Sequence, residues 1–244
     1  MYSILRKELS SFFSSLTGYI TIAIFLFAVS WFMWISPGEL NVMDAGYANI
    51  DTLFVIAPWV FLFLVPAATM RSFSEEKRLG TLELILTRPI TDWQLVLGKF
   101  FAAVILILLS LLPCLIYLIS VYNLATPVGN LDMGGIWGSF TGLFLLASCY
   151  ASVGIFASSI TDNQLVAFIL AAVFCFILYI GFDGLSSIPM LKSVDRQIQL
   201  FGINEHYRAV SRGVIDSRNV LYFISVVAIF LSATVAKLKS RLKK

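Results

Sequence analysis

The charged side chains gather between Arg71 and Lys99, a stretch that holds nine of the 31 acidic and basic residues in the chain. The long apolar runs on either side of this stretch hold no charge. Placing one such charge at the centre of a bilayer costs about 2.5 to 3.5 kcal/mol. If the flanking runs cross a membrane, the charged stretch must therefore remain in water between two spans.

Patterns that would support catalysis are missing from the sequence. No GxxxxGK[ST] phosphate cradle occurs, because Gly98-Lys99 lacks the glycine five residues earlier and is followed by Phe100. No predicted span combines serine with histidine, pairs two carboxylates or carries an HExxH helix. We therefore expect no catalytic, cofactor-binding or metal site in this chain.

Local signals give the charged stretch a bent shape. Ser72 and Glu75 have the spacing of a capping box, which predicts a helix start, and Gly80 interrupts this helix. Thr91 and Gln94 repeat the capping spacing where the next span begins. Between the two capping boxes, an apolar helix face is formed by Leu82, Ile85 and Leu86. This helical turn ends at Arg88-Pro89. The pattern predicts an amphipathic elbow, and a solvated connector whose leucines lie on the lipid surface fits the same composition.

The residues SEEKRLGTLELILTRPI, with Leu97-Gly98-Lys99 at the start of the next span, resemble the loop after the second span of type-2 ABC exporter permeases. In that family this loop forms the coupling helix that docks on the ATPase. The segments LRKELSSFFSSLTGYI and NEHYRAVSRGVIDSRNVLYF resemble the family's amphipathic N-terminal helix and the short outer helices before its last span. The resemblance covers nearly the whole chain, and it is greatest to the permease associated with bacterial gliding motility.

The resemblance implies that the elbow docks on the ATPase, and from the residue types we infer a role for each contact. Gly80 would allow a close backbone approach to the ATPase. Apolar packing would come from Leu82, Leu86 and Pro89. The polar rim would consist of Glu75, Glu76, Arg78, Glu83 and Arg88.

Composition places the chain in a membrane. Of its 244 residues, 59% are hydrophobic and 13% charged, and the mean hydropathy is +0.90. In a soluble domain about a quarter of the residues are charged. Uncharged runs of about 20 residues match a hydrocarbon layer of about 30 Å. We therefore predict an all-α integral membrane protein with six transmembrane helices.

The predicted spans cover about residues 19–36, 52–70, 100–122, 134–158, 164–182 and 219–236. Residues 1–16 are predicted to form an amphipathic interfacial helix. We expect that this helix is not cleaved off as a signal peptide, because the uncharged run from Leu9 to Gly38 is far longer than the apolar core of such a peptide. Residues 71–99 form the cytoplasmic coupling segment and residues 183–218 an outer loop with short helices. The chain as a whole, 1–244, is expected to be a single permease domain.

Basic residues set the expected orientation. The N-terminal segment, the elbow and the tail hold 12 of the 17 Lys and Arg residues. The other five lie between Asp183 and Arg218, on the side that six crossings place outside. The positive-inside bias therefore places both termini in the cytoplasm, although the last outer loop is not depleted in basic residues.

Small residues within the spans indicate close packing. In the fourth span, glycines recur every four residues at Gly134, Gly138 and Gly142. This spacing lets another helix approach closely. That helix would belong either to the same subunit or to a second permease subunit. The cysteines lie inside apolar runs and are expected as core residues, namely Cys114, Cys149 and Cys175.

The segment before the last span is predicted to contain a short helix. Asn204 is placed to cap this helix, and Gly213 is placed to close it. His206 is the single histidine in the chain and has no second histidine or cysteine beside it. We expect His206 to lie at the surface.

No acidic, basic or histidine residue lies within a predicted span, although ion- and proton-coupled carriers normally need such groups. The resemblance accordingly implies the transmembrane subunit of an ATP-driven exporter in a bacterial inner membrane, with ATP and Mg²⁺ bound by separate cytosolic ATPase subunits. It also implies a second permease subunit, identical or different, contact with membrane lipid and, as an optional component, a periplasmic accessory subunit. No nucleic-acid footprint is present.

The alternatives are a stand-alone channel or uniport-type carrier and a membrane enzyme, and the sequence does not define a substrate.

Overall fold

The structure is a computed structural model that describes residues 1–86, 90–187, 195–213 and 216–241. Within these ranges the regular secondary structure is helical throughout, without a strand. Six helices are long and apolar enough to cross a membrane. The all-α membrane fold predicted from composition is therefore confirmed.

The helices follow one another through short connections. Their bounds are α1 (Tyr2–Ser14), α2 (Leu16–Ser30), the π-helix η1 (Trp31–Ile35), α3 (Asp51–Thr69), α4 (Arg71–Arg78), α5 (Thr81–Leu86), α6 (Asp92–Leu111), α7 (Cys114–Leu124), α8 (Met133–Ile160), α9 (Gln164–Phe176), the π-helix η2 (Ile177–Gly181), α10 (Phe182–Ser186), α11 (Asp195–Gln199), α12 (Ile203–Ser211) and α13 (Ser217–Arg241). The six candidate spans are Leu16–Ile35, Asp51–Arg78, Asp92–Leu124, Met133–Ile160, Gln164–Ser186 and Ser217–Ser240. They correspond one to one to the six predicted spans.

Helix α8 lies at the centre of the bundle, where α3, α6, α9, α12 and α13 pack against it. Its many small residues let these neighbours approach closely. A methyl group at Gly154 would come within 2.0 Å of Thr69 Oγ1 on α3. The core therefore forms around α8, whereas α2, α9 and α13 present apolar side chains outward.

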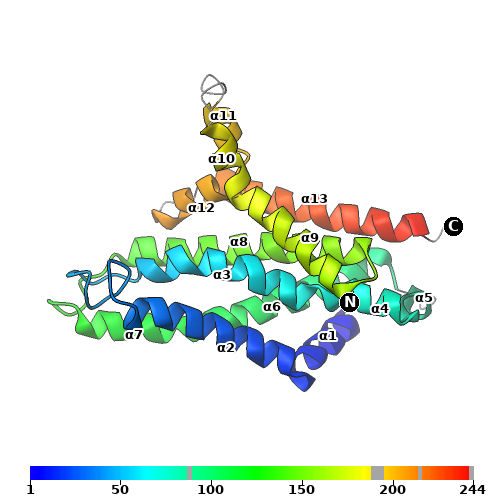
Figure 1. Cartoon of the computed structure of the whole chain (residues 1–244), viewed down its shortest axis with the longest axis horizontal. Coiled ribbons are helices and arrows are strands. Elements are labelled where there is room, and N and C mark those ends of the chain that lie inside the picture. Colours follow the sequence, from blue (N-terminus) through cyan, green and yellow to red (C-terminus); the bar gives the residue numbers. More distant parts are fainter. Residues whose placement is uncertain (87–89, 188–194, 214–215, 242–244) are drawn as a thin grey trace.

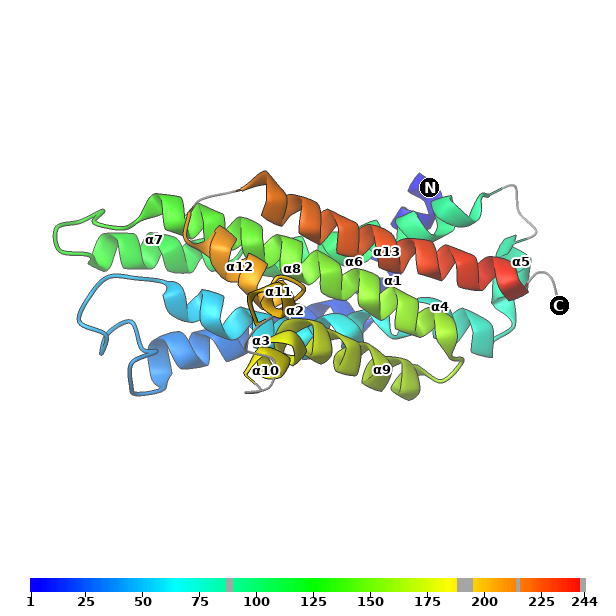
Figure 2. The same cartoon turned by 90° about the horizontal axis from the view of Figure 1, so that it is seen from above.

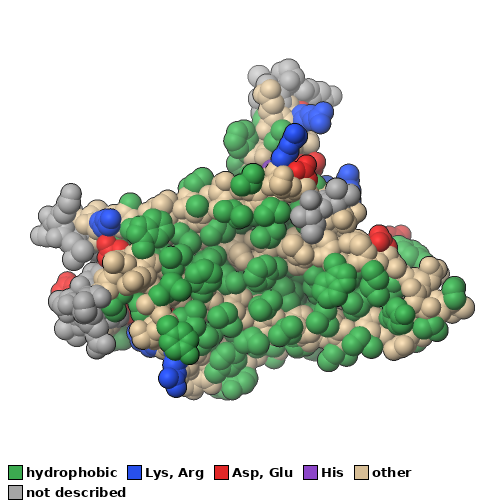
Figure 3. Space-filling model, turned by 180° about the vertical axis from the view of Figure 1, so that it is seen from behind, with side chains coloured by type: hydrophobic (Ala, Val, Ile, Leu, Met, Phe, Trp, Pro, Cys, Tyr) green, Lys and Arg blue, Asp and Glu red, His purple; other side chains and the backbone are tan. Residues whose placement is uncertain are grey.

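The bundle has two distinct ends (Figures 1 and 2). Helices α1, α4 and α5, the N-terminus and the last described residues of α13 lie toward one end, which we name the elbow end. The loops before α3 and α8, together with α12, lie toward the other, the α12 end, and α10 and α11 project sideways from the bundle. Figure 3 shows a face that is almost wholly apolar between the ends, with charged side chains near the ends and on the projection. An apolar band between two polar layers is the arrangement that a bilayer requires.

The two predicted capping boxes have different outcomes. No box forms at Ser72 and Glu75, because α4 follows α3 after a single turn residue and Ser72 already lies inside the helix. The box at Thr91 and Gln94 is confirmed, with both of its hydrogen bonds at 3.3 Å. The difference arises because the chain enters α6 from a non-helical segment, where the first N–H groups need a partner.

Helix α12 also differs from its prediction at its start. Its N-cap is Gly202, and Asn204 lies within the helix, where its amide donates to Asp183 Oδ2 at 2.6 Å. The predicted closure at Gly213 is confirmed by a φ of +83°. Such a left-handed residue at a helix C-terminus is commonly glycine, which has no Cβ penalty there.

His206 is buried, so the predicted surface position is wrong. Its Nδ1 lies 2.7 Å from Asn219 Oδ1 and its Nε2 lies 2.9 Å from the Leu200 carbonyl oxygen. The ring stacks on Tyr222 at a centroid distance of 3.9 Å. Each ring nitrogen thus has a polar atom within hydrogen-bond distance, as is usual for a buried polar side chain. The cysteines, by contrast, are buried as predicted.

The glycines of the fourth span face α12 and its C-terminal turn. A methyl group on Gly138 would lie 2.6 Å from the Val210 carbonyl oxygen, and one on Gly142 would lie 3.3 Å from Val210 Cγ1. A methyl group on Gly213 would lie 3.0 Å from the Gly134 carbonyl carbon. Their close neighbour in this chain is therefore the short helix α12.

Candidate functional site

Four charged side chains meet at the elbow end, two from α1, one from α4 and one from α6. Lys99 Nζ lies 2.8 Å from Glu8 Oε1 and 3.0 Å from Glu76 Oε1. The same ammonium group donates to the Ser72 carbonyl oxygen at 2.6 Å. Lys7 Nζ lies 3.0 Å from the shared Glu76 oxygen. We name Lys7, Glu8, Glu76 and Lys99 the elbow ion cluster.

Burial indicates that this cluster has a structural role. The Lys99 side chain is 1% exposed, and those of Glu8 and Glu76 are 14% and 12% exposed. Lys99 Nζ also lies 5.0 Å from the centroid of the Phe73 ring, within range of a cation–π contact. Removing one member of a buried ion pair typically costs about 3 to 5 kcal/mol, because the other charge is left without compensation. The cluster therefore fixes α1 and α4 to α6.

Packing of α1 on α6 brings the charges together. Ile4 lies directly against Gly98, where a methyl group would come within 2.9 Å of Ile4 Cγ2. Residues three and four positions apart share a helix face. Lys7 and Glu8 therefore lie one turn beyond Ile4, on the face that reaches Lys99. No group of three or more metal-ligating side chains occurs in the described ranges, and the two carboxylates here bind ammonium groups.

Helix α4 is joined to the end of α8 as well. Ser158 Oγ accepts hydrogen bonds from the backbone N–H of Phe73 at 2.7 Å and from that of Ser74 at 3.1 Å. Lys77 donates to the Ser159 carbonyl oxygen, and its Nζ lies 4.0 Å from Asp162 Oδ1. Helix α4 is thus held by α6 on one side and by the turn between α8 and α9 on the other.

The turn between α4 and α5 is exposed beyond these contacts. Gly80 ends α4 with a φ of +68°, a conformation that favours glycine. Leu79 is 62% exposed, and Arg78 and Glu83 are exposed on either side of the turn. We name Arg78, Leu79, Gly80 and Glu83 the elbow surface.

The structure changes several of the predicted contact roles. Leu82 is 5% exposed and Glu76 belongs to the elbow ion cluster, so burial contradicts the exposed roles predicted for both. A methyl group at Gly80 would meet no atom of the described chain within 4 Å, so the close approach predicted there to the ATPase stays a prediction. Glu75 is partly exposed. The remaining predicted contacts lie outside what the structure describes, namely the Leu86 side chain, Arg88 and Pro89.

Sequence reasoning missed Leu79 and the elbow ion cluster. Leu79 becomes exposed because the chain reverses at Gly80, and Leu82 turns inward for the same reason. The sequence holds a partial signal for Lys99, which follows the Thr91 cap by about two helical turns and must therefore lie inside α6. Its partners come from α1, and no local pattern links α1 to α6.

Comparison with known protein families covers the part of the elbow that lies on α4, α5 and α6. A family model described as ABC-2 family transporter protein matches residues 40–202, about two thirds of the chain. The matched range includes α3 to α6 and therefore the elbow surface, Glu76 and Lys99. This chain belongs to the ABC-2 transporter family.

As an ABC-2 family member, the chain is the transmembrane subunit of an ABC transporter and a multi-pass membrane protein. The family implies an ABC ATPase partner and a dimeric arrangement. The match is to ABC-2 transporters in general and gives no support to the narrower resemblance to gliding-motility permeases. A search of curated proteins finds no match.

Proposed function

We propose that this ABC-2 subunit works in an ATP-driven exporter, in which separate ATPase subunits bind ATP and Mg²⁺ and push on the elbow surface. The observation that carries the proposal is an exposed turn with buried anchors directly behind it. Helix α4 continues from α3, and the elbow ion cluster ties it to α1 and α6. A displacement of the elbow surface would therefore move the second and third spans together.

The elbow surface has the composition of a small protein contact. Leu79 supplies an exposed apolar centre, and Arg78 and Glu83 supply charges of both signs around it. An apolar centre with a polar rim is common in protein interfaces. The open space around Gly80 leaves room for the backbone of a partner. Leu79 thus takes the apolar role that buried Leu82 does not fill.

Charge distribution supports an orientation for the complex. The elbow end carries the elbow and the basic tail, and the positive-inside bias assigns such an end to the cytoplasm. Both termini then lie inside, and the complex resides in a bacterial inner membrane. Rocking of α3 and α6 after ATP binding would open a path toward the α12 end.

Co-purification with the ABC ATPase co-expressed with this chain tests the docking assignment. Leu79→Asp and Glu83→Arg should each lower the amount of bound ATPase at least tenfold, about 1.4 kcal/mol, without changing the melting temperature of the chain. Glu39→Arg is the matched charge reversal, because Glu39 is exposed in the loop at the α12 end. Unchanged ATPase binding by both elbow variants would overturn the docking assignment.

A second measurement addresses the exporter itself. ATP hydrolysis should appear in vesicles that hold both subunits and should be absent from vesicles that hold this chain alone. Nucleotide-independent leakage of small solutes through the chain alone would contradict the proposal and favour a stand-alone channel.

A further inference from the structure

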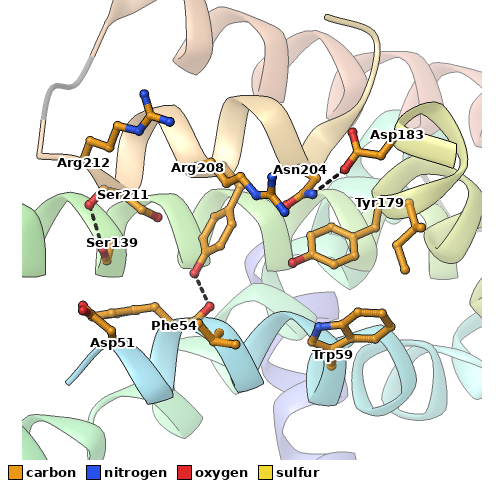
Figure 4. Close-up of a pocket in the computed structure, with 13 residues that line it drawn as sticks. Asp51, Phe54, Trp59, Ser139, Tyr179, Asp183, Asn204, Arg208, Ser211 and Arg212 are labelled. Atoms are coloured by element: carbon orange, nitrogen blue, oxygen red, sulfur yellow. Dashed lines mark hydrogen bonds between the residues drawn. The ribbon is translucent and has the colours of Figure 1, made fainter. Parts of the chain in front are cut away.

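A cavity of about 650 Å³ opens at the α12 end, far from the elbow surface. Figure 4 shows its walls, with α12 on one side, α3 opposite, and Tyr179 and Asp183 from the end of the fifth span. Its volume lies in the range of small-molecule sites, about 300 to 1,000 Å³. Two walls of the cavity are joined, because Tyr207 of α12 donates to the Phe54 carbonyl oxygen of α3 at 2.7 Å. Burial raises the pKa of this Tyr207 hydroxyl, which therefore remains a donor.

The cavity carries two positive and two negative side chains on different walls. Arg208 lies on α12 and Arg212 follows four residues later, directly after the helix, and Asp51 lies across from them at the start of α3 (Figure 4). Within the described ranges neither arginine has a carboxylate within 4.0 Å, and Asp51 has no cationic partner at that distance. Asp183 accepts a hydrogen bond from the neutral Asn204 amide, which leaves its charge in place. In the described ranges four charged groups therefore line one cavity without forming an ion pair.

An apolar track leads away from these charges along α3. Val55 and Trp59 line the cavity and are 51% and 44% exposed, and Phe63 continues the same face one turn further. The three residues span about 12 Å of helix at 1.5 Å per residue. Ile180 lines the cavity from the neighbouring fifth span. A hydrocarbon chain lying on this track would run from the charged groups toward the middle of the apolar band.

We propose that this cavity binds a zwitterionic amphiphile, with its phosphate at Arg208 and Arg212, its ammonium group at Asp51, and one acyl chain along Val55, Trp59 and Phe63. Guanidinium groups match phosphate oxygens in a bidentate geometry, which two arginines four residues apart can offer together. The carboxylate on the opposite wall requires a positive group in the same ligand, so a purely anionic headgroup leaves Asp51 unpaired. The apolar track would be left uncovered by a water-soluble headgroup compound, because such a compound has no acyl chain. Binding does not depend on an ATPase, so its test is separate from that of the exporter.

Quenching of Trp59 fluorescence reports on this site. A variant that keeps Trp59 and has phenylalanine at the other four tryptophan positions is placed in phosphatidylglycerol vesicles and titrated with acyl-brominated phosphatidylethanolamine. We expect Trp59 quenching to saturate at a mole fraction at least tenfold below that needed for brominated phosphatidylglycerol. A variant that keeps Trp137 is the matched control, because Trp137 is exposed outside the cavity and should follow the bulk lipid composition. Equal quenching of Trp59 by both lipids would refute the zwitterion assignment.

Charge variants in the same background separate the two ends of the headgroup. Arg208→Gln with Arg212→Gln should weaken quenching by both lipids at least tenfold, whereas Asp51→Asn should abolish the preference for phosphatidylethanolamine and leave phosphatidylglycerol unaffected. Glu39→Gln and Arg218→Gln remove exposed charges outside the cavity and should change neither titration. All these positions are exposed, so melting temperatures should stay constant and confirm folding. No effect of the double arginine substitution would overturn the site.

Competition by water-soluble glycerophosphoethanolamine tests whether the acyl chain contributes to binding. It should displace the brominated lipid at least a hundredfold less well than phosphatidylethanolamine does. Displacement at equal concentration would overturn the role of the acyl track and identify a soluble phosphate compound as the ligand.

Discussion

The elbow ion cluster and the cavity at the α12 end each contain two basic and two acidic side chains, and the two sets are arranged in opposite ways. In the elbow ion cluster Lys99 lies within 3.0 Å of two carboxylates and is 1% exposed. Around the cavity at the α12 end, Arg208 and Arg212 are exposed and, in the described part of the chain, have no ion-pair partner. The same kinds of charge thus join three helices at one end and line an open space at the other.

The difference separates structural charges from charges available to a ligand. A largely buried ion cluster contributes little to binding, but it is costly to break because its buried members would be left in a low dielectric without an opposite charge. Exposed, unpaired charges contribute little to folding, since a surface ion pair is itself worth about 0 to 1 kcal/mol. Substitutions in the elbow ion cluster should therefore change stability first, and substitutions of the charges that line the cavity should change ligand binding first.

The largest effect is expected from Lys99→Met. This substitution leaves Glu8 without its cation and Glu76 with the exposed Lys7 alone, and it should lower the free energy of unfolding by about 3 to 5 kcal/mol. Denaturant unfolding of the chain in detergent, followed by tryptophan fluorescence, measures the change. Lys7→Met is the matched control, because Lys7 contacts the same Glu76 oxygen but is 60% exposed, and it should cost less than about 1 kcal/mol.

Combined substitution of the cluster sharpens this result. Replacing Glu8 and Glu76 by glutamine together with Lys99→Met removes the three buried charges of the cluster and leaves only that of Lys7, which is 60% exposed. The triple variant should recover most of the stability that Lys99→Met loses, since neutral replacements of a buried ion cluster are often tolerated. A triple variant less stable than Lys99→Met would show that the cluster does not act through charge pairing.

Leucines on the two sides of Gly80 provide the next test. Leu82→Ala should lower the free energy of unfolding by about 2 to 5 kcal/mol, because it opens a cavity in the core. Leu79→Ala should change stability by less than about 0.5 kcal/mol, yet reduce the amount of ATPase that co-purifies. Thermal unfolding and co-purification on the same two variants measure both effects. The reverse pattern would mean that Leu82, as first predicted from the sequence, forms the contact.

Local signals in the sequence predicted much of the fold and less of the site. Apolar runs located the six spans, and the Thr91 cap and the Gly213 closure followed from short motifs. These features depend on a few neighbouring residues and on the thickness of a bilayer. Ser72 failed as a cap because its role depends on whether the preceding span ends before it.

Long-range contacts account for what the sequence did not reveal. Lys99 meets Glu8 across 91 positions of sequence, and the cavity combines residues of α3, α8, α12 and the fifth span. The inward position of Leu82 and the burial of His206 likewise depend on which helix packs nearby. A pattern of polar and apolar residues cannot choose among such partners, because every amphipathic face has several helices available to cover it.

The glycines of α8 test how the α12 end is held. Gly138→Ala should lower the free energy of unfolding by about 1 to 3 kcal/mol, because its methyl group would meet the backbone of Val210 and Gly213 at 2.6 and 2.9 Å. Gly134→Ala should be nearly neutral, since its methyl group would approach the Asp132 carboxylate no closer than 3.4 Å. Gly138→Ala should also weaken the Trp59 quenching by displacing α12. Equal stabilities for the two variants would argue against close packing of α12 on α8.

The smallest effect is expected at Gly80, where conformation and contact can be separated. Gly80→Ala should cost about 1 to 2 kcal/mol, because a φ of +68° strains a residue with a Cβ atom. Gly80→Asn should cost less in unfolding measurements, since asparagine adopts this conformation more readily. Asparagine nevertheless fills the open space beside the turn, so it should reduce ATPase co-purification more than it reduces stability. If asparagine restored stability and ATPase binding alike, Gly80 would serve the bend alone, and the partner's backbone would have to approach the elbow surface elsewhere.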